Sequence, residues 1–183
     1  MWYEKPRDWG SIKNFNIDHL RLLKLKYEND PLSVTRHSVD QNWLMGHAIP
    51  PFQRPIVWGE DKMIAFIETL VQKGDAGTYT YHTSETSVRT PDGRDVYPRD
   101  MWLLDGQQRL TSIDRFFDGE FPVYGLFWSE VDPVRQRAFL NGTFAAYEVR
   151  NKSELELREL YDLKNFGGVA HEEHQRAVPQ HRP

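Results

Sequence analysis

The chain has 183 residues, a formal net charge of −4 and no cysteine. This length suits one domain with a single sizeable core, and 39% hydrophobic with 27% charged residues is typical of a folded, soluble protein. Without cysteine, disulfides, thiol nucleophiles and zinc–thiolate sites are excluded. The acidic balance excludes a basic nucleic-acid coat, although a local basic patch could still contact DNA.

The sequence carries no targeting pattern. No apolar run approaches the roughly 20 residues that a membrane helix needs. The first residues also lack the basic-then-apolar order of a signal peptide. We therefore expect a cytoplasmic protein with no membrane partner.

The first sixty residues show weak periodicity. Asp18 is a candidate cap for a helix that reaches Tyr27, and a second, short helix is expected over residues 39–45. Residues 48–55 contain three prolines, which lack amide donors and restrict the preceding residues to extended conformations. This segment is therefore predicted to be extended and to lead into a turn.

From residue 60 onward the pattern predicts alternating helices and strands. Apolar residues recur at helical spacing over 60–72, and a Ser-x-x-Glu capping box begins at Ser153. In chain order we expect a helix over 60–72, a strand over 78–83, a loop or hairpin turn over 84–98, a strand over 101–104, a helix from Gly106 to Gly119, a strand over 121–128, a helix over 133–140, a strand over 143–149 and a helix from Ser153. This order indicates an α+β fold with a small sheet.

Asp105-Gly106-Gln107-Gln108-Arg109 stands where a strand turns into a helix. The first amides of a helix have no intrahelical partner and bind anions. A glycine lets a phosphate approach the backbone, the glutamines add donors, and an arginine grips phosphate with a planar fork. Asp105 is a candidate helix cap, Mg²⁺ ligand or orienter of a nucleophile. The same letters also fit a plain helix start with surface Gln and Arg.

Gln53 and Arg54 lie in the proline-fixed segment, and Trp58 follows four residues after Arg54. A held backbone presents side chains at little cost in ordering. An arginine beside an aromatic ring stacks on a base or takes a phosphate. The alternative is an ordinary loop with a surface ion pair at Arg54 and a core tryptophan.

Three blocks in this order resemble one known family. Residues 49–58 read Ile-Pro-Pro-Phe-Gln-Arg-Pro-Ile-Val-Trp, residues 103–112 read Leu-Leu-Asp-Gly-Gln-Gln-Arg-Leu-Thr-Ser, and residues 160–168 end in Asn-Phe-Gly-Gly. They resemble the Ile-Pro-x-[Phe/Tyr]-Gln-Arg block, the Asp-Gly-Gln-Gln-Arg signature and the Asn-x-Gly-Gly helix end of the amino-terminal domain of GmrSD-type enzymes. These enzymes restrict modified DNA, and relatives include the SspE effector of phage defence.

The resemblance implies a ParB/sulfiredoxin-like small mixed sheet flanked by helices, spanning residues 36–170 after an extension over 1–35 and before a flexible tail over 171–183. It also implies binding and hydrolysis of a nucleoside triphosphate with Mg²⁺. The implied catalytic residues are Asp105, Arg109 and Gln108, with Asp105 as the metal ligand. The implied nucleotide-binding residues are Gln53, Arg54, Gly106, Gln107, Gln108, Arg109, Thr111, Asn165, Gly167 and Gly168.

Long family members also carry a His-Asn-His nuclease domain. A chain of 183 residues has no room for one, so we expect this domain to stand alone, with DNA, a partner protein or a second copy as candidate partners. Outside the three blocks, His171 and His174 are spaced for a shared metal on a helix, but no third ligand is nearby and a solvated tail is the favoured interpretation. Lone histidines such as His82 are expected to be structural.

Three functions follow as hypotheses. The first is a nucleoside triphosphatase with a DNA-related role in restriction, modification or phage–host conflict, with direct nuclease action as a minor variant. The second is a phosphotransferase that passes a γ-phosphate to a hydroxyl of a small molecule or modified base, with Asp105 as base. The third is a non-catalytic module that responds to nucleotide or DNA by changing conformation or assembly.

Overall fold

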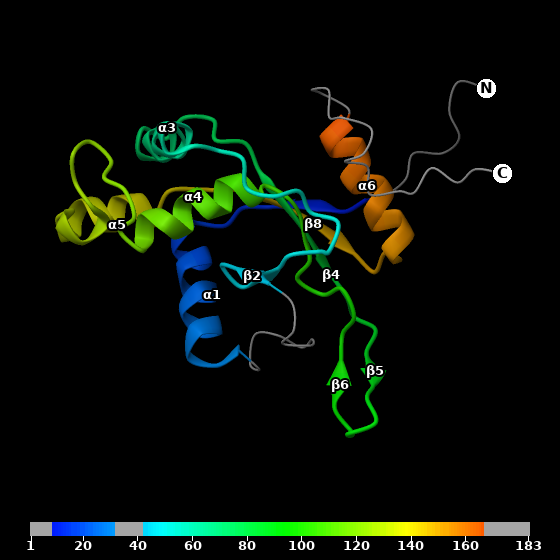
Figure 1. Cartoon of the computed structure of the whole chain (residues 1–183). Helices are drawn as coiled ribbons and strands as arrows, with labels where there is room; N and C mark the ends of the chain where they lie inside the picture. The colour runs from blue at the N-terminus through cyan, green and yellow to red at the C-terminus, as the bar shows by residue number, and fades with distance from the viewer. Residues whose placement is uncertain (1–8, 32–41, 167–183) are drawn as a thin grey trace.

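The computed structural model describes residues 9–31 and 42–166 (Figure 1). Its centre is a four-stranded mixed sheet in which β4 and β8 run parallel and the two outer pairs are antiparallel. The strand order is β1 (Ser11–Lys13), β8 (Ala146–Arg150), β4 (Tyr79–Thr83) and β7 (Leu103–Asp105). The expected α+β class, with a small mixed sheet flanked by helices, is confirmed.

Helices cover both sides of the sheet. They are α1 (Ile17–Asn29), α3 (Glu60–Val71), α4 (Gln107–Phe117), α5 (Pro133–Leu140) and α6 (Glu154–Phe166), with a 3-10 turn η1 (Trp128–Glu130). Figure 1 shows α6 on the opposite side of the strands from α1 and α5. The helices expected over 60–72, up to Gly119, over 133–140 and from Ser153 are confirmed. No helix within the two described ranges is long and apolar enough to cross a bilayer.

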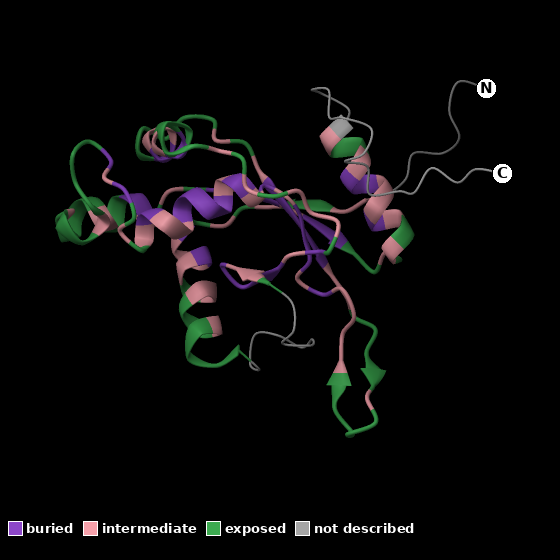
Figure 2. Ribbon diagram, viewed as in Figure 1, coloured by how far each residue is buried: buried purple, intermediate pink, exposed green. Residues whose placement is uncertain are grey.

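Two apolar clusters lie on the two faces of the sheet. Leu103 and Leu104 are adjacent in β7, and both are fully buried, but they belong to different clusters because successive strand residues point to opposite faces. The larger cluster packs the sheet against α1, α3 and α4, and the smaller one packs it against α6. Figure 2 shows the buried residues concentrated on α4 and the central strands.

Residues 11–29 belong to the same body as the rest of the fold. Strand β1 pairs with β8, and Ile17 and Leu20 on α1 are completely buried in the larger cluster. The helix begins after Asn16, whose side chain accepts the backbone N–H of His19, and not after Asp18. Within the segment expected as an extension over 1–35, residues 11–29 therefore contribute an edge strand and a core helix.

The helix expected over 39–45 is wrong in its described part. Residues 43–48 form a hairpin of β2 (Trp43–Leu44) and β3 (His47–Ala48). Met45 and Gly46 make the turn with φ values of 48° and 77°, which a right-handed helix cannot accommodate. Residues 39–41 lie outside the described residues.

The strand expected over 121–128 is also wrong. Tyr124 and Gly125 have φ values of 50° and 76° and make a tight turn, with an isolated bridge between Val123 and Leu126. Phe121 and Val123 are buried, so their apolar character serves the core and not a ladder. The hairpin turn expected over 84–98 is confirmed as β5 (Val88–Arg89) and β6 (Asp95–Val96), which project from the body in Figure 1.

Candidate functional site

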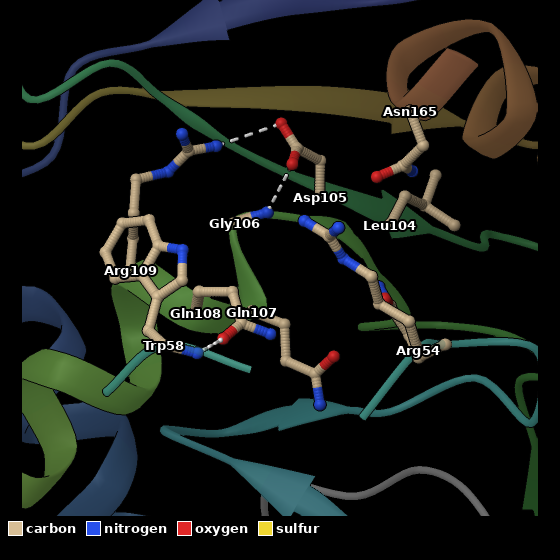
Figure 3. Close-up of a pocket in the computed structure, with 10 residues that line it drawn as sticks. Arg54, Trp58, Leu104, Asp105, Gly106, Gln107, Gln108, Arg109 and Asn165 are labelled. Carbon is tan, nitrogen blue, oxygen red and sulfur yellow. Dashed lines mark hydrogen bonds and ion pairs between the residues drawn. The ribbon is translucent and has the colours of Figure 1, made fainter. Parts of the chain in front are cut away.

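A pocket lies where β7 turns into α4, and the proline segment and the end of α6 also line it (Figure 3). Its space is about 360 Å³, including the open mouth. The residues that line it are Gln53, Arg54, Trp58, Leu104, Asp105, Gly106, Gln107, Gln108, Arg109 and Asn165. The three blocks that resemble one family in sequence therefore meet at one place in space.

Gly106 is required by the local backbone. It precedes α4 with a φ of 91°, and a Cβ atom there would lie 2.6 Å from Tyr79 Cβ on β4. Only glycine fits this close approach of the turn to the strand. Tyr79 occupies the space where a side chain of residue 106 would lie, so the glycine is required for packing and for the turn. A close approach of a phosphate to the Gly106 backbone stays a prediction.

The start of α4 offers backbone donors. No side chain caps this helix, whereas Asn16 caps α1 and Asp132 caps α5. Among the described residues, none accepts a hydrogen bond from the amides of residues 107–109. Because these N–H groups lie at the positive end of the helix dipole, they favour an anion.

Asp105 and Arg109 form an ion pair at the pocket wall. The Asp105 Oδ2 atom accepts a hydrogen bond from the Arg109 guanidinium at 3.0 Å, and its Oδ1 accepts the Gly106 N–H at 2.7 Å. Arg109 also lies against Gly77, 3.5 Å from where a Cβ of that residue would stand. Asp105 thus orients Arg109 and does not cap the second or third amide of the helix.

Gln108 has a positioning role that its sequence context did not reveal. Its side chain is buried, and its Oε1 atom accepts the N–H groups of Val57 and Trp58 at 2.9 and 3.0 Å. Its Nε2 atom donates to the Pro55 carbonyl at 3.2 Å. The residue lines the pocket as expected, but its amide keeps only one N–H for a ligand.

Gln53 and Arg54 are held in place by β7 and α6. Gln53 Nε2 donates to the Leu103 carbonyl at 2.7 Å, and the Arg54 N–H donates to the Tyr161 hydroxyl at 3.3 Å. Burial raises the pKa of Tyr161, so this hydroxyl stays neutral at ordinary pH. Figure 3 shows the Arg54 guanidinium directed across the pocket toward Gly106 and Asp105.

Asn165 brings the end of α6 into the site. Its Nδ2 atom donates to the Tyr161 carbonyl at 2.8 Å, so the amide is held from within its own helix. In Figure 3 this amide points toward the space in front of Asp105 and Arg54. With one N–H engaged, the amide oxygen is available as an acceptor for a ligand hydroxyl or a bound cation.

Of the other predicted site residues, one is not brought to the pocket and two cannot be placed. Thr111 is only 6% exposed on α4 and does not line the pocket, and Gly167 and Gly168 lie outside the described residues. Conversely, Leu104 in the wall and Tyr161 behind Arg54 were missed. No sequence signal could have found Tyr161, because its hydroxyl acts on a backbone 107 residues away.

A Mg²⁺ ion fits this pocket only together with a ligand. In the two described ranges no cluster of three or more His, Asp or Glu residues is suited to a metal, and Asp105 is the single carboxylate among the residues lining the pocket. Mg²⁺ is commonly bound by one or two carboxylates plus substrate phosphates and water. Asp105 fits that mode, whereas a protein-only cage is not formed. The histidines His171 and His174 lie outside the described residues.

His82 has the structural role expected of it. It is buried, its Nδ1 lies 2.7 Å from the Arg99 carbonyl, and its Nε2 accepts the Lys152 N–H at 3.0 Å. These contacts assign the proton to Nδ1. Burial lowers the pKa of His82, which keeps the ring neutral.

Comparison with known proteins gives one match. A family model described as the N-terminal domain of the GmrSD restriction endonuclease matches residues 37–178. No curated protein and no solved structure matches the chain. The matched region is most of the chain and contains all three pocket-forming blocks, which confirms the resemblance drawn from the sequence. The chain belongs to the family of the GmrSD restriction endonuclease N-terminal domain.

Proposed function

We propose that this domain binds and hydrolyses a nucleoside triphosphate in the pocket at the start of α4, and that it does so in the service of DNA restriction. The observation that carries the proposal is the convergence, in one concave site, of the Arg54 guanidinium with helix amides at residues 107–109 that have no acceptor among the described residues. Backbone amides at a helix start and a planar guanidinium are the groups that proteins use for phosphate.

The charge of the lining favours a polyanion. The lining holds two arginines, Arg54 and Arg109, and one carboxylate, Asp105, so the formal charge of the lining residues is +1. Mg²⁺ would neutralise part of the triphosphate charge, and Asp105 is the residue that would hold it. In phosphoryl transfer, positioning and charge stabilisation supply most of the rate enhancement. The pocket residues supply those two things.

Phosphate release tests the proposal. The intact chain is incubated with ATP, GTP, CTP or UTP, with and without Mg²⁺, and free phosphate is measured. We expect release that needs Mg²⁺ and that falls by at least about tenfold in Arg109→Ala, since one charged contact contributes roughly this much. Arg115→Ala is the matched control, because Arg115 lies further along the same helix and pairs with Glu120 on the surface.

The possible results distinguish nucleotide hydrolysis from phosphotransfer and from DNA cleavage. No phosphate release with any nucleotide contradicts hydrolysis. If the nucleotide carries a labelled γ-phosphate, transfer of that label to an added hydroxyl compound, with little free phosphate, would instead establish a phosphotransferase. A plasmid-nicking assay in the same buffer tests direct nuclease action, for which we expect no cleavage.

One observation favours a second candidate, a nucleotide-responsive module without turnover. Both carboxylate oxygens of Asp105 already accept hydrogen bonds, from Gly106 and Arg109. These donors take two of the roughly four acceptor sites of the carboxylate, which leaves Asp105 less available to take a proton from a substrate. This candidate predicts saturable nucleotide binding and a nucleotide-dependent change in oligomer size, measured by light scattering, with no phosphate released.

A further inference from the structure

Trp58 is the one aromatic side chain among the described residues that line the pocket. Its indole is partly buried and packs against the larger core cluster through Phe66, with ring centroids 5.9 Å apart. The Lys62 ammonium lies 4.8 Å from the centre of the indole. Phe66 therefore supports the ring from the core, the exposed Lys62 lies over the ring from the surface, and Trp58 borders the pocket.

The position of Trp58 is tied to the start of α4. Its backbone N–H donates to Gln108 Oε1 at 3.0 Å, and Gln108 belongs to the first turn of that helix. The indole and the helix amides thus keep a fixed relation, which lowers the entropy lost when a ligand contacts both. Figure 3 shows Trp58 on the Arg109 side of Gly106, with Arg54 and Asn165 on the other side.

The pocket consequently has two chemically different walls. One wall carries the Arg54 guanidinium and the Asn165 amide, and the other carries the Trp58 indole beside Arg109. An aromatic surface next to a phosphate site suits a planar ring, because stacking on an indole stabilises a base independently of hydrogen bonds. Inorganic phosphate chains would engage only the helix amides and the guanidinium groups.

We infer that Trp58 is the platform on which the nucleobase of the bound triphosphate stacks. The inference rests on the proposed nucleotide binding and adds the residue that distinguishes a nucleotide from a bare phosphate chain. Every base has a π-face, so stacking tolerates different bases. Trp58 therefore recognises the nucleobase as a class, and its loss weakens binding of all four nucleoside triphosphates by a similar factor.

Calorimetric titration of two kinds of ligand into three variants and the unaltered chain tests this inference. The ligands are each nucleoside triphosphate with Mg²⁺ and inorganic tripolyphosphate with Mg²⁺. In Trp58→Ala we expect nucleotide affinity to fall by roughly 5-fold to 160-fold, the range that one stacked base contributes. Tripolyphosphate affinity should stay within about twofold of the unaltered chain, and in Trp58→Phe the loss of nucleotide affinity should be smaller.

Trp128→Phe serves as the matched control. Trp128 is also a partly buried tryptophan in an aromatic cluster, with Phe116, Phe117 and Phe139, but it does not line the pocket. We expect it to leave both affinities unchanged. Retained tripolyphosphate binding by Trp58→Ala shows that the variant is folded.

Different results would contradict base stacking on Trp58 and nucleotide binding by the pocket. Equal loss of nucleotide and tripolyphosphate binding in Trp58→Ala, or no loss of either, overturns the stacking role while the phosphate site stands. If the unaltered chain binds tripolyphosphate as tightly as nucleotide, stacking is also overturned. If the unaltered chain binds neither ligand, the proposed function itself fails.

Discussion

The Gln108 side-chain oxygen accepts the backbone N–H of Trp58 at 3.0 Å across 50 residues of sequence. The same amide also bonds the backbone at Pro55 and Val57. Through these bonds a buried side chain of α4 fixes the segment that carries Arg54 and Trp58. The two walls of the pocket therefore depend on one another.

Replacing Gln108 should loosen both the fold and the pocket. Gln108→Ala leaves two backbone N–H groups without their acceptor, and we expect a loss of about 1–3 kcal/mol in the free energy of unfolding. Urea denaturation measures it. Gln72→Ala is the control, because among the described residues the exposed Gln72 amide bonds the Tyr124 hydroxyl alone, and its loss should cost less than about 0.5 kcal/mol. Equal stability of the two variants would contradict the proposed role of Gln108 in holding the backbone of residues 55–58.

Gly106 should tolerate no side chain. Gly106→Ala combines a positive φ with a Cβ placed 2.6 Å from Tyr79 Cβ, so overpacking adds about 1–3 kcal/mol to the backbone strain. Gly119→Ala separates the two effects, because Gly119 has a φ of 71° but no atom within 4 Å of its added Cβ. The control should cost only about 1–2 kcal/mol. The prediction fails if thermal unfolding shows both variants equally destabilised.

Helix α1 should be a cooperative part of the domain. Leu20 is completely buried and Leu22, on the same helix, is 53% exposed. We expect Leu20→Ala to lower the free energy of unfolding by about 2–5 kcal/mol, and Leu22→Ala to change it by less than about 0.5 kcal/mol. Denaturant titration provides both numbers. A small effect of Leu20→Ala would mean that residues 11–29 are a dispensable extension after all.

Stability should fall in mild acid because of His47. This ring is 1% exposed, its Nδ1 lies 3.0 Å from the Met45 carbonyl, and burial lowers its pKa from 6.5 to about 4. Since the folded-state pKa is below the unfolded one, the unfolded chain binds more protons between these two values. The neutral ring therefore contributes its full stability above pH 6.5 and loses it progressively down to pH 4.

The slope is the measurable quantity. In this window His47 should add about 1.4 kcal/mol of unfolding free energy per pH unit as the pH rises. His47→Asn should remove that part of the slope even if it lowers stability at every pH. The lowered pKa of His82 contributes a further slope of the same sign, which remains in the variant. An unchanged slope in His47→Asn would contradict the assignment.

The helices could be predicted because their patterns are local. Apolar residues at helical spacing place α3 and α4, and the capping box at the start of α6 is present, with the Ser153 backbone N–H donating to Glu156 and the Glu156 N–H donating to the Ser153 hydroxyl. The proline block and the Asp-Gly-Gln-Gln-Arg block could be joined only through the resemblance, because no local pattern says that segments 50 residues apart form one pocket.

The errors arose where tertiary packing overrides local preference. Met45 and Tyr124 take left-handed backbone conformations that favour glycine. Each lies in a turn within an apolar stretch, and the residue type at that position does not predict the turn. The positioning role of Gln108 was equally invisible. Its partners are backbone groups of another segment, and a surface glutamine and a buried one read alike in sequence.

The measurement closest to the central claim is a calorimetric titration of each nucleoside triphosphate with Mg²⁺ into the intact chain, Arg54→Ala and Arg89→Ala. Arg89 lies 68% exposed on the β5–β6 hairpin and serves as the control. We predict saturable binding of at least one nucleotide that weakens by at least about tenfold in Arg54→Ala and is unchanged in Arg89→Ala. No binding of any nucleotide at millimolar concentration, or equal affinity in Arg54→Ala, would contradict a phosphate site at the start of α4.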